Sequence, residues 1–284
     1  MSILRAVMIG DVVGDPGLEA LEERLPGLIQ ETGAALVTVN GENAAGGFGM
    51  TGETLKRILN AGADVVTSGN HVWEKRDFWQ VMNTDSRILR PANYPAGVPG
   101  RGWITIGKNV EGDFVSWLVI NLQGRELMKP IDCPFRTFDE IANSRNGIAS
   151  DTHPLFDLEG LLPNLESGSS DIIVVDFHAE SSQEKEALAF YLDGRAGIVA
   201  GTHTHVQTAD ERILPKGTAY ITDLGMTGVK NSILGMDTTI CLNRAKTQLS
   251  SRMECAKGEA AIQGIIVEID RQTGKAVSIR RIRG

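Results

Sequence analysis

The sequence predicts an α/β fold with a largely parallel sheet, or sheets, flanked by helices. Short apolar segments alternate with segments of helical periodicity between residues 4 and 68, a pattern typical of parallel strands joined by crossover helices. Metal-ligand residue types follow several of these apolar segments directly. The chain has 284 residues, 42% of them hydrophobic, which is enough for one sizeable core. We therefore expect a single domain over residues 1–284.

The first elements are expected in the order strand, helix, strand, helix, strand. The three strands are residues 4–10, 34–39 and 64–68. Leucines at helical spacing predict an amphipathic helix over residues 17–31, in which Pro26 favours a kink. Thr51 is well placed to cap a second helix that ends near Gly62. The crossovers between these parallel strands are expected to be right-handed.

The middle of the chain is less regular. Residues 103–107 and 114–122 are expected to pair as strands around a turn. Mixed helix and loop signals over residues 124–168 favour a cap or lid inserted into the domain. His153 lies in this insertion and is expected at the surface.

Regular patterns return in the last part of the chain. The predicted strands are residues 171–175, 196–200 and 218–222. A helix is expected over residues 182–192, with Ala187, Leu188 and Tyr191 facing inward. Strand-like spacing over residues 262–269 and 275–282, around a short turn, predicts a C-terminal β-hairpin.

The composition limits the partners and the compartment. The chain has 28 basic and 36 acidic residues and a net charge of −8, which argues against a stable nucleic-acid complex. Its three cysteines are widely spaced and form no disulfide framework. The N-terminal residues lack the plan of a signal peptide, and no apolar run is long enough to span a bilayer. We expect a soluble, cytoplasmic protein with no membrane partner.

Residues of metal-ligand type lie at the ends of the predicted strands. They are Asp11, Glu42, Asn70, His178, His203 and His205. Ligands of open α/β sheets gather beyond the carboxyl ends of the strands, so these side chains are expected on one rim. A mixed set of nitrogen and oxygen ligands suits Zn, Mn, Fe or Ni, and one carboxylate can bridge two ions.

Structural explanations for these residues remain open alongside the metal site. Asp11 could cap the helix that follows it, and Asn70 could hold a left-handed turn. His178 could be a hydrogen-bonded core histidine. If the stretch around His203 and His205 is extended, both imidazoles project to one side. They could then reach one metal site or two ions side by side.

The same residues resemble the motifs of calcineurin-like metallophosphoesterases. The matching residues are Asp11, Gly69-Asn70-His71, His178 and Gly201-Thr202-His203-Thr204-His205. Two motifs depart from the usual form of the superfamily. Asp11-Val12-Val13 stands where D-x-H is usual, and Gly41-Glu42-Asn43 stands where G-D is usual. Both departures are similar to the YmdB-like bacterial phosphodiesterases, and this similarity covers nearly the whole chain.

The resemblance implies a layered metallophosphoesterase core that holds two metal ions. We expect these ions to be Fe or Mn, with Zn, Ni or Mg as the alternatives. The residues implied for the first ion are Asp11, Glu42 and His205, and those for the second are Glu42, Asn70, His178 and His203. Glu42 would thus bridge the ions. Asn43 would contact the phosphate or a metal, and His71 would act as an acid or stabilise charge in the transition state.

The resemblance also implies a function. We expect a metal-dependent phosphodiesterase that hydrolyses small phosphodiesters such as 2′,3′- or 3′,5′-cyclic nucleotides and assembles as a homo-oligomer, either a dimer or a tetramer. One alternative is a phosphomonoesterase such as a nucleotidase. Another is a regulatory protein that uses the metal site to bind a phosphorylated ligand.

Overall fold

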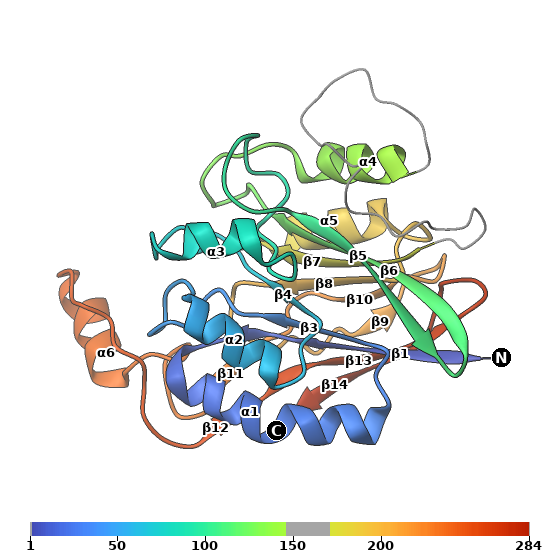
Figure 1. Cartoon of the computed structure of the whole chain (residues 1–284). Helices are drawn as coiled ribbons and strands as arrows, with labels where there is room; N and C mark the ends of the chain where they lie inside the picture. The colour runs from blue at the N-terminus through green and yellow to red at the C-terminus, as the bar shows by residue number, and fades with distance from the viewer. Residues whose placement is uncertain (1, 146–170, 284) are drawn as a thin grey trace.

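Two β-sheets packed face to face form the centre of the protein, and helices cover their outer faces (Figure 1). The computed structural model describes residues 2–145 and 171–283. The predicted α/β class with parallel strands and flanking helices is confirmed, but the strands divide between two sheets. Much of the expected insertion, at residues 146–170 and including His153, lies outside the described residues.

The first sheet has the strand order β14-β13-β1-β3-β4. Its strands are β1 (Ile3–Ile9), β3 (Leu36–Asn40), β4 (Val65–Thr67), β13 (Gln263–Asp270) and β14 (Ala276–Arg283). As predicted from the alternation of strands and helices, β1, β3 and β4 run parallel. The predicted C-terminal hairpin is confirmed, and its strand β13 also pairs antiparallel with β1. The hairpin therefore extends the sheet beside the N-terminal strand.

The second sheet has the order β5-β6-β7-β8-β10-β9. Its strands are β5 (Trp103–Val110), β6 (Asp113–Gln123), β7 (Ile172–His178), β8 (Ile198–Thr202), β9 (Arg212–Ile213) and β10 (Ala219–Ile221). The four inner strands are parallel, and the two outer strands are antiparallel. A small third sheet joins β2 (Asp11–Val12), β11 (Met226–Val229) and β12 (Ala260–Ala261), which sequence patterns did not predict.

Side-chain alternation along the strands explains the layers. In β1, Val7 and Ile9 face the helices over the first sheet, whereas Ala6 and Met8 face the second sheet. Both faces of the inner strands are therefore apolar, as expected for parallel strands that are covered on both sides.

The helices divide between the two outer faces. Over the first sheet lie α1 (Gly14–Thr32), α2 (Gly52–Asn60) and α3 (Phe78–Thr84), and over the second lie α4 (Pro134–Arg145) and α5 (Ser182–Tyr191). Thr51 caps α2, as predicted, and the structure adds a capping box with Thr54, while Pro26 lies inside α1. The remaining described helix, α6 (Thr238–Thr247), has no buried residue. No helix in the described ranges is long and apolar enough to cross a membrane.

The inward face of α5 differs from the prediction. Leu188 is buried, but Ala187 and Tyr191 are exposed. Two charged residues, Glu184 and Lys185, are buried in place of Ala187 and Tyr191. Glu184 accepts backbone hydrogen bonds from residues 125 and 126, and Lys185 has a buried carboxylate partner. Apolar periodicity could not reveal this face because its charges are paired through tertiary contacts.

Candidate metal centre

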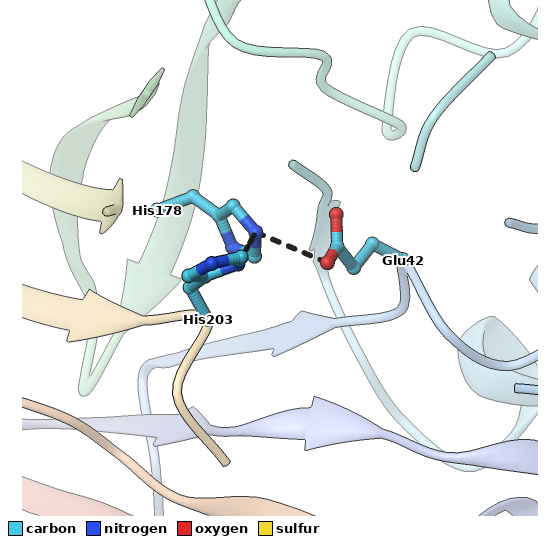
Figure 2. Close-up of side chains that lie close together, drawn as sticks. All are labelled: Glu42, His178 and His203. Carbon is cyan, nitrogen blue, oxygen red and sulfur yellow. Dashed lines mark hydrogen bonds and ion pairs between the residues drawn. The ribbon is translucent and has the colours of Figure 1, made fainter. Parts of the chain in front are cut away.

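Loops that follow strands of both sheets meet at one edge of the sandwich. Glu42 follows β3 and Asn70 follows β4 of the first sheet. His178 ends β7, and His203 directly follows β8, in the second sheet. Figure 2 shows Glu42 pointing across the gap toward the two histidines. The predicted common rim therefore exists, but two facing sheets form it.

Three acceptor atoms converge on Nε2 of His178. Glu42 Oε1 lies 3.0 Å away, Asn70 Oδ1 lies 3.1 Å away and His203 Nδ1 lies 3.0 Å away. Ligand atoms of Glu42, His178 and His203 all lie within 4.8 Å of one another. A single N–H group has one proton for three acceptors, whereas a cation attracts all of them. These mixed nitrogen and oxygen donors fit a first-row transition metal.

Asp11 and His205 form the neighbouring part of the centre. Asp11 is fully buried, and its Oδ1 has no hydrogen-bond partner among the described residues. This oxygen lies 3.8 Å from His205 Nε2 and 4.0 Å from His178 Nδ1. Asn43 Nδ2 lies 3.0 Å from His205 Nε2 and donates to Glu42 Oε1 at 3.2 Å. A buried carboxylate oxygen without a donor is costly unless a cation balances it, so Asp11 also fits a metal site.

Each of the three histidines has its other ring nitrogen next to an acceptor. The partners are Thr202 Oγ1 for His178 Nδ1 at 3.0 Å, Glu180 Oε2 for His203 Nε2 at 3.0 Å, and the carbonyl oxygen of Leu234 for His205 Nδ1 at 3.1 Å. Metal-binding histidines usually donate the second N–H to such an acceptor, which fixes the ring and its tautomer. The remaining nitrogens, which are His178 Nε2, His203 Nδ1 and His205 Nε2, all face the centre.

Two glycines allow the backbone to pass close to this centre. A Cβ on Gly69 would lie 2.2 Å from His178 Cδ2 and 2.3 Å from Glu42 Oε2, so it would fill the space between two candidate ligands. A Cβ on Gly201 would lie 1.8 Å from the carbonyl oxygen of Thr222. The backbone at Gly201 therefore leaves no room for a side chain.

The backbone after β8 is not extended, so the condition under which both imidazoles would project to one side is not met. His203 and His205 have φ values of 103° and 64°, in the left-handed region that residues other than glycine rarely adopt. Thr204 between them turns away, and its N–H and hydroxyl donate to Asp223 Oδ2 at 3.0 and 2.8 Å. The turn sends His203 toward His178 and His205 toward Asn43. Strain of this kind clusters at functional sites.

His71 borders the centre but does not enter it. Its backbone N–H donates to Glu42 Oε2 at 3.2 Å, and its side chain is 29% exposed. Its Nδ1 lies 3.4 Å from Glu74 Oε1, and its ring meets that of Phe48 edge-on at 5.1 Å. The other ring nitrogen, Nε2, has no hydrogen-bond partner among the described residues.

The buried charges shift the pKa values of one another. Burial lowers the pKa of His178, but the charge and hydrogen bond of Glu42 outweigh it and raise the value from 6.5 to about 9. Burial raises the pKa of Glu42, but His178 lowers it to about 2. Burial raises the pKa of Asp11 to about 6, although His205 opposes this rise. Burial, and then the charge of His178, lowers the pKa of His203 to about 3.

Without metal, the protein is expected to lose stability as the pH rises from 6.5 to about 9. His178 has a folded-state pKa above its unfolded value, so its contribution is complete below pH 6.5 and disappears as pH passes through about 9. Urea unfolding of chelator-treated protein across this range measures the loss. In His178→Gln the loss should be absent. A wild-type profile as flat as that of the variant would contradict the prediction.

Sequence reasoning did not identify the groups that orient the histidines. Glu180 was available as a signal, because it follows His178 by two residues. Thr202 lies inside the recognised motif but was not assigned a role. Leu234 had no sequence signal, because it acts through its carbonyl oxygen.

Comparison with known proteins places this arrangement in a family. The sequence model described as "YmdB-like protein" matches residues 7–282. A protein of Bacillus subtilis (strain 168), named 2′,3′-cyclic-nucleotide 2′-phosphodiesterase, is 43% identical over 279 residues, which cover 98% of this chain and 96% of the relative.

Two solved structures share the fold over almost their full length. One is described as a novel phosphatase from Mycoplasma pneumoniae. It has a TM-score of 0.85 and 30% identity, and the match covers 100% of this chain and 94% of that chain. The other is a hypothetical protein from Thermus thermophilus, with a TM-score of 0.82, 36% identity and 99% coverage of both chains. Because the family model and these relatives match nearly the whole sequence, the chain belongs to the YmdB-like protein family.

Proposed function

We propose that the protein is a dinuclear-metal-dependent phosphodiesterase that hydrolyses small phosphodiesters, with 2′,3′- or 3′,5′-cyclic nucleotides as substrates. The observation that carries this proposal is the convergence of Glu42, Asn70 and His203 on Nε2 of His178. The name of the Bacillus subtilis relative, a 2′,3′-cyclic-nucleotide 2′-phosphodiesterase, supports this class of substrate.

We propose that Glu42 bridges two ions. The ligands of the first ion are Asp11, Glu42 and His205, and those of the second are Glu42, Asn70, His178 and His203. The opposite directions of the two histidines after β8 support this division, since His205 lies against Asn43 and His203 lies against His178. Of the candidate metals, we expect Fe or Mn, and elemental analysis of the purified protein tests this expectation.

The residues around the ligands suit phosphodiester hydrolysis. When bound, two divalent ions lower the pKa of water and offset the charge of a phosphoryl group. Asn43 has an amide donor that can hydrogen-bond to a phosphate oxygen or, through its carbonyl oxygen, contact a metal. His71, with Nδ1 beside Glu74, can donate a proton from Nε2 to the leaving oxygen.

A substrate panel tests the proposed activity. Bis-p-nitrophenyl phosphate and 2′,3′- and 3′,5′-cyclic nucleotides are expected to be hydrolysed faster than p-nitrophenyl phosphate. Chelation should abolish turnover, and added Mn²⁺ should restore it. Faster hydrolysis of the monoester would favour a phosphatase, the activity for which the Mycoplasma pneumoniae structure is named.

A regulatory role remains the alternative from a different class. In that case the metal site would bind a phosphorylated ligand without hydrolysing it. Tight, metal-dependent ligand binding with no turnover on any substrate of the panel would favour this alternative. The oligomeric state is a separate prediction, and sedimentation velocity would distinguish a dimer or tetramer from a monomer.

A further inference from the structure

We propose that Asp176 is a positioning residue that acts through the Thr202 hydroxyl to fix which nitrogen His178 presents to the metal centre. The proposal rests on the metal site of the proposed function, and it adds two residues to which the sequence motifs assign no role. Asp176 is 1% exposed and Thr202 is fully buried, so neither residue can reach a substrate.

The direction of the hydrogen bonds carries the argument. His178 Nδ1 lies 3.0 Å from Thr202 Oγ1, and the Thr202 hydroxyl donates to Asp176 Oδ1 at 2.7 Å. An ionised carboxylate only accepts hydrogen bonds, and a hydroxyl has one proton. Because that proton goes to Asp176, Thr202 must accept from His178. The imidazole therefore holds a proton on Nδ1, so that Nε2, which faces the centre, is the nitrogen that can offer its lone pair to a metal ion.

The other carboxylate oxygen of Asp176 hydrogen-bonds to residues of the first sheet, and through them it helps to position Glu42. Asp176 Oδ2 accepts hydrogen bonds from the hydroxyl of Thr67 and from Asn40 Nδ2, the latter at 3.1 Å. Asn40 Oδ1 in turn accepts from the backbone N–H of Glu42 at 3.1 Å. One buried carboxylate thus links the ends of β3, β4, β7 and β8. It orients a candidate ligand from each sheet, which is how groups behind the ligands tune a metal site.

Isosteric substitution of Thr202 tests this relay, by which we mean the hydrogen bonds that run from His178 through the Thr202 hydroxyl to Asp176. Thr202→Val keeps the shape of the side chain but leaves His178 Nδ1 without an acceptor, whereas Thr202→Ser keeps the hydroxyl. Mn²⁺ binding to chelator-treated protein, measured by isothermal titration calorimetry, should weaken in Thr202→Val by about 10- to 100-fold at one of the two binding steps. Thr202→Ser should bind Mn²⁺ nearly as tightly as wild type, because it keeps the hydroxyl that accepts from His178 Nδ1.

A matched control separates positioning from general loss of stability. Thr218 is also fully buried and uses its hydroxyl to donate to the carbonyl oxygen of Ala196 at 2.6 Å. It directly precedes β10, whose first residue pairs with the first residue of β8, so it lies at the end of the strands away from Thr202. Thr218→Val removes a comparable buried hydrogen bond, so it should lower the unfolding midpoint in urea and leave Mn²⁺ affinity unchanged.

A spectroscopic measurement reports on the ring itself. In Zn²⁺-loaded, ¹⁵N-labelled protein, the Nδ1 proton of His178 should be visible and slow to exchange in wild type and Thr202→Ser, and it should exchange fast in Thr202→Val. If Thr202→Val does not fold, Asp176→Asn serves instead, because an amide cannot accept from all three donors. It too should weaken Mn²⁺ binding by at least about tenfold.

The outcomes decide between the relay and simpler explanations. Wild-type Mn²⁺ affinity in Thr202→Val, equal weakening in Thr218→Val, or failure of Thr202→Ser to restore binding would each overturn the proposal, as would a wild type that binds no Mn²⁺. A wild type that binds Mn²⁺ but hydrolyses no phosphodiester would overturn only the proposed activity, because the affinity measurements do not depend on turnover.

Discussion

Replacing Glu42 with alanine is expected to strip the protein of most of its bound metal and, with it, of its phosphodiesterase activity. Glu42 is 1% exposed and lies 3.0 Å from His178 Nε2, so it faces the centre with no competing solvent. Removing one partner from a buried set of charges costs about 3–5 kcal/mol, because the remaining charges stay buried without compensation. That cost corresponds to a loss of roughly 10²- to 10⁴-fold in metal affinity.

Elemental analysis after dialysis, combined with turnover on bis-p-nitrophenyl phosphate, measures the effect of Glu42→Ala. Glu42→Gln keeps the shape of the side chain and should also lose metal, because an amide carries no net negative charge to balance a bound cation. Glu211→Gln is the matched control, since Glu211 is a partly buried carboxylate paired with Arg281 outside the centre. Unaltered metal content in both Glu42 variants would count against the bridge.

Replacing His71 with alanine is expected to lower turnover by roughly 10²- to 10⁴-fold while metal content stays near that of wild type. The reason for this separation is geometric. His71 touches Glu42 only through its backbone N–H, which alanine retains, whereas its ring lies at the partly exposed border of the site. The expected loss is that of a general acid, not that of a ligand.

A leaving-group series on His71→Ala distinguishes proton donation from a structural effect. Esters with good leaving groups such as p-nitrophenolate need little protonation, so their hydrolysis should fall less than that of cyclic nucleotides. Phe48→Leu, which removes the ring packed against His71, is the control for altered packing of the loop. Turnover of His71→Ala at the wild-type rate on cyclic nucleotides would exclude the acid role.

Most of the central strands could be predicted because their signals are local. Apolar runs of four to eight residues bounded by polar residues indicate buried strands whatever their neighbours are. The same local reasoning missed the three short strands of the third sheet, including the one that holds Asp11 beside Met226. Strands of two to four residues are stabilised by their partners and have no periodicity of their own.

The division into two sheets also could not be read from local pattern. The inner strands of both sheets are apolar on both faces. The same sequence pattern would be expected for a single wide sheet covered on both sides and for two stacked sheets. The pairing of β13 with β1 joins residues from opposite ends of the chain in the first sheet, and side chains of both sheets pack between them. For the same reason, the buried charges of α5 look like a solvent-facing stripe until their partners are known.

The sequence by itself determined the types of candidate ligand, their position after strand ends and the family, since residue identity and order along the chain are enough for these. Only the tertiary structure decided how those ligands face one another. The left-handed backbone at His203 and His205 turns two neighbouring imidazoles toward different groups. Asp176 in β7 hydrogen-bonds to residues at the ends of three other strands, and Leu234 offers a carbonyl oxygen to His205. These contacts join residues far apart in the sequence, and their strength depends on burial and direction, which a linear pattern does not record.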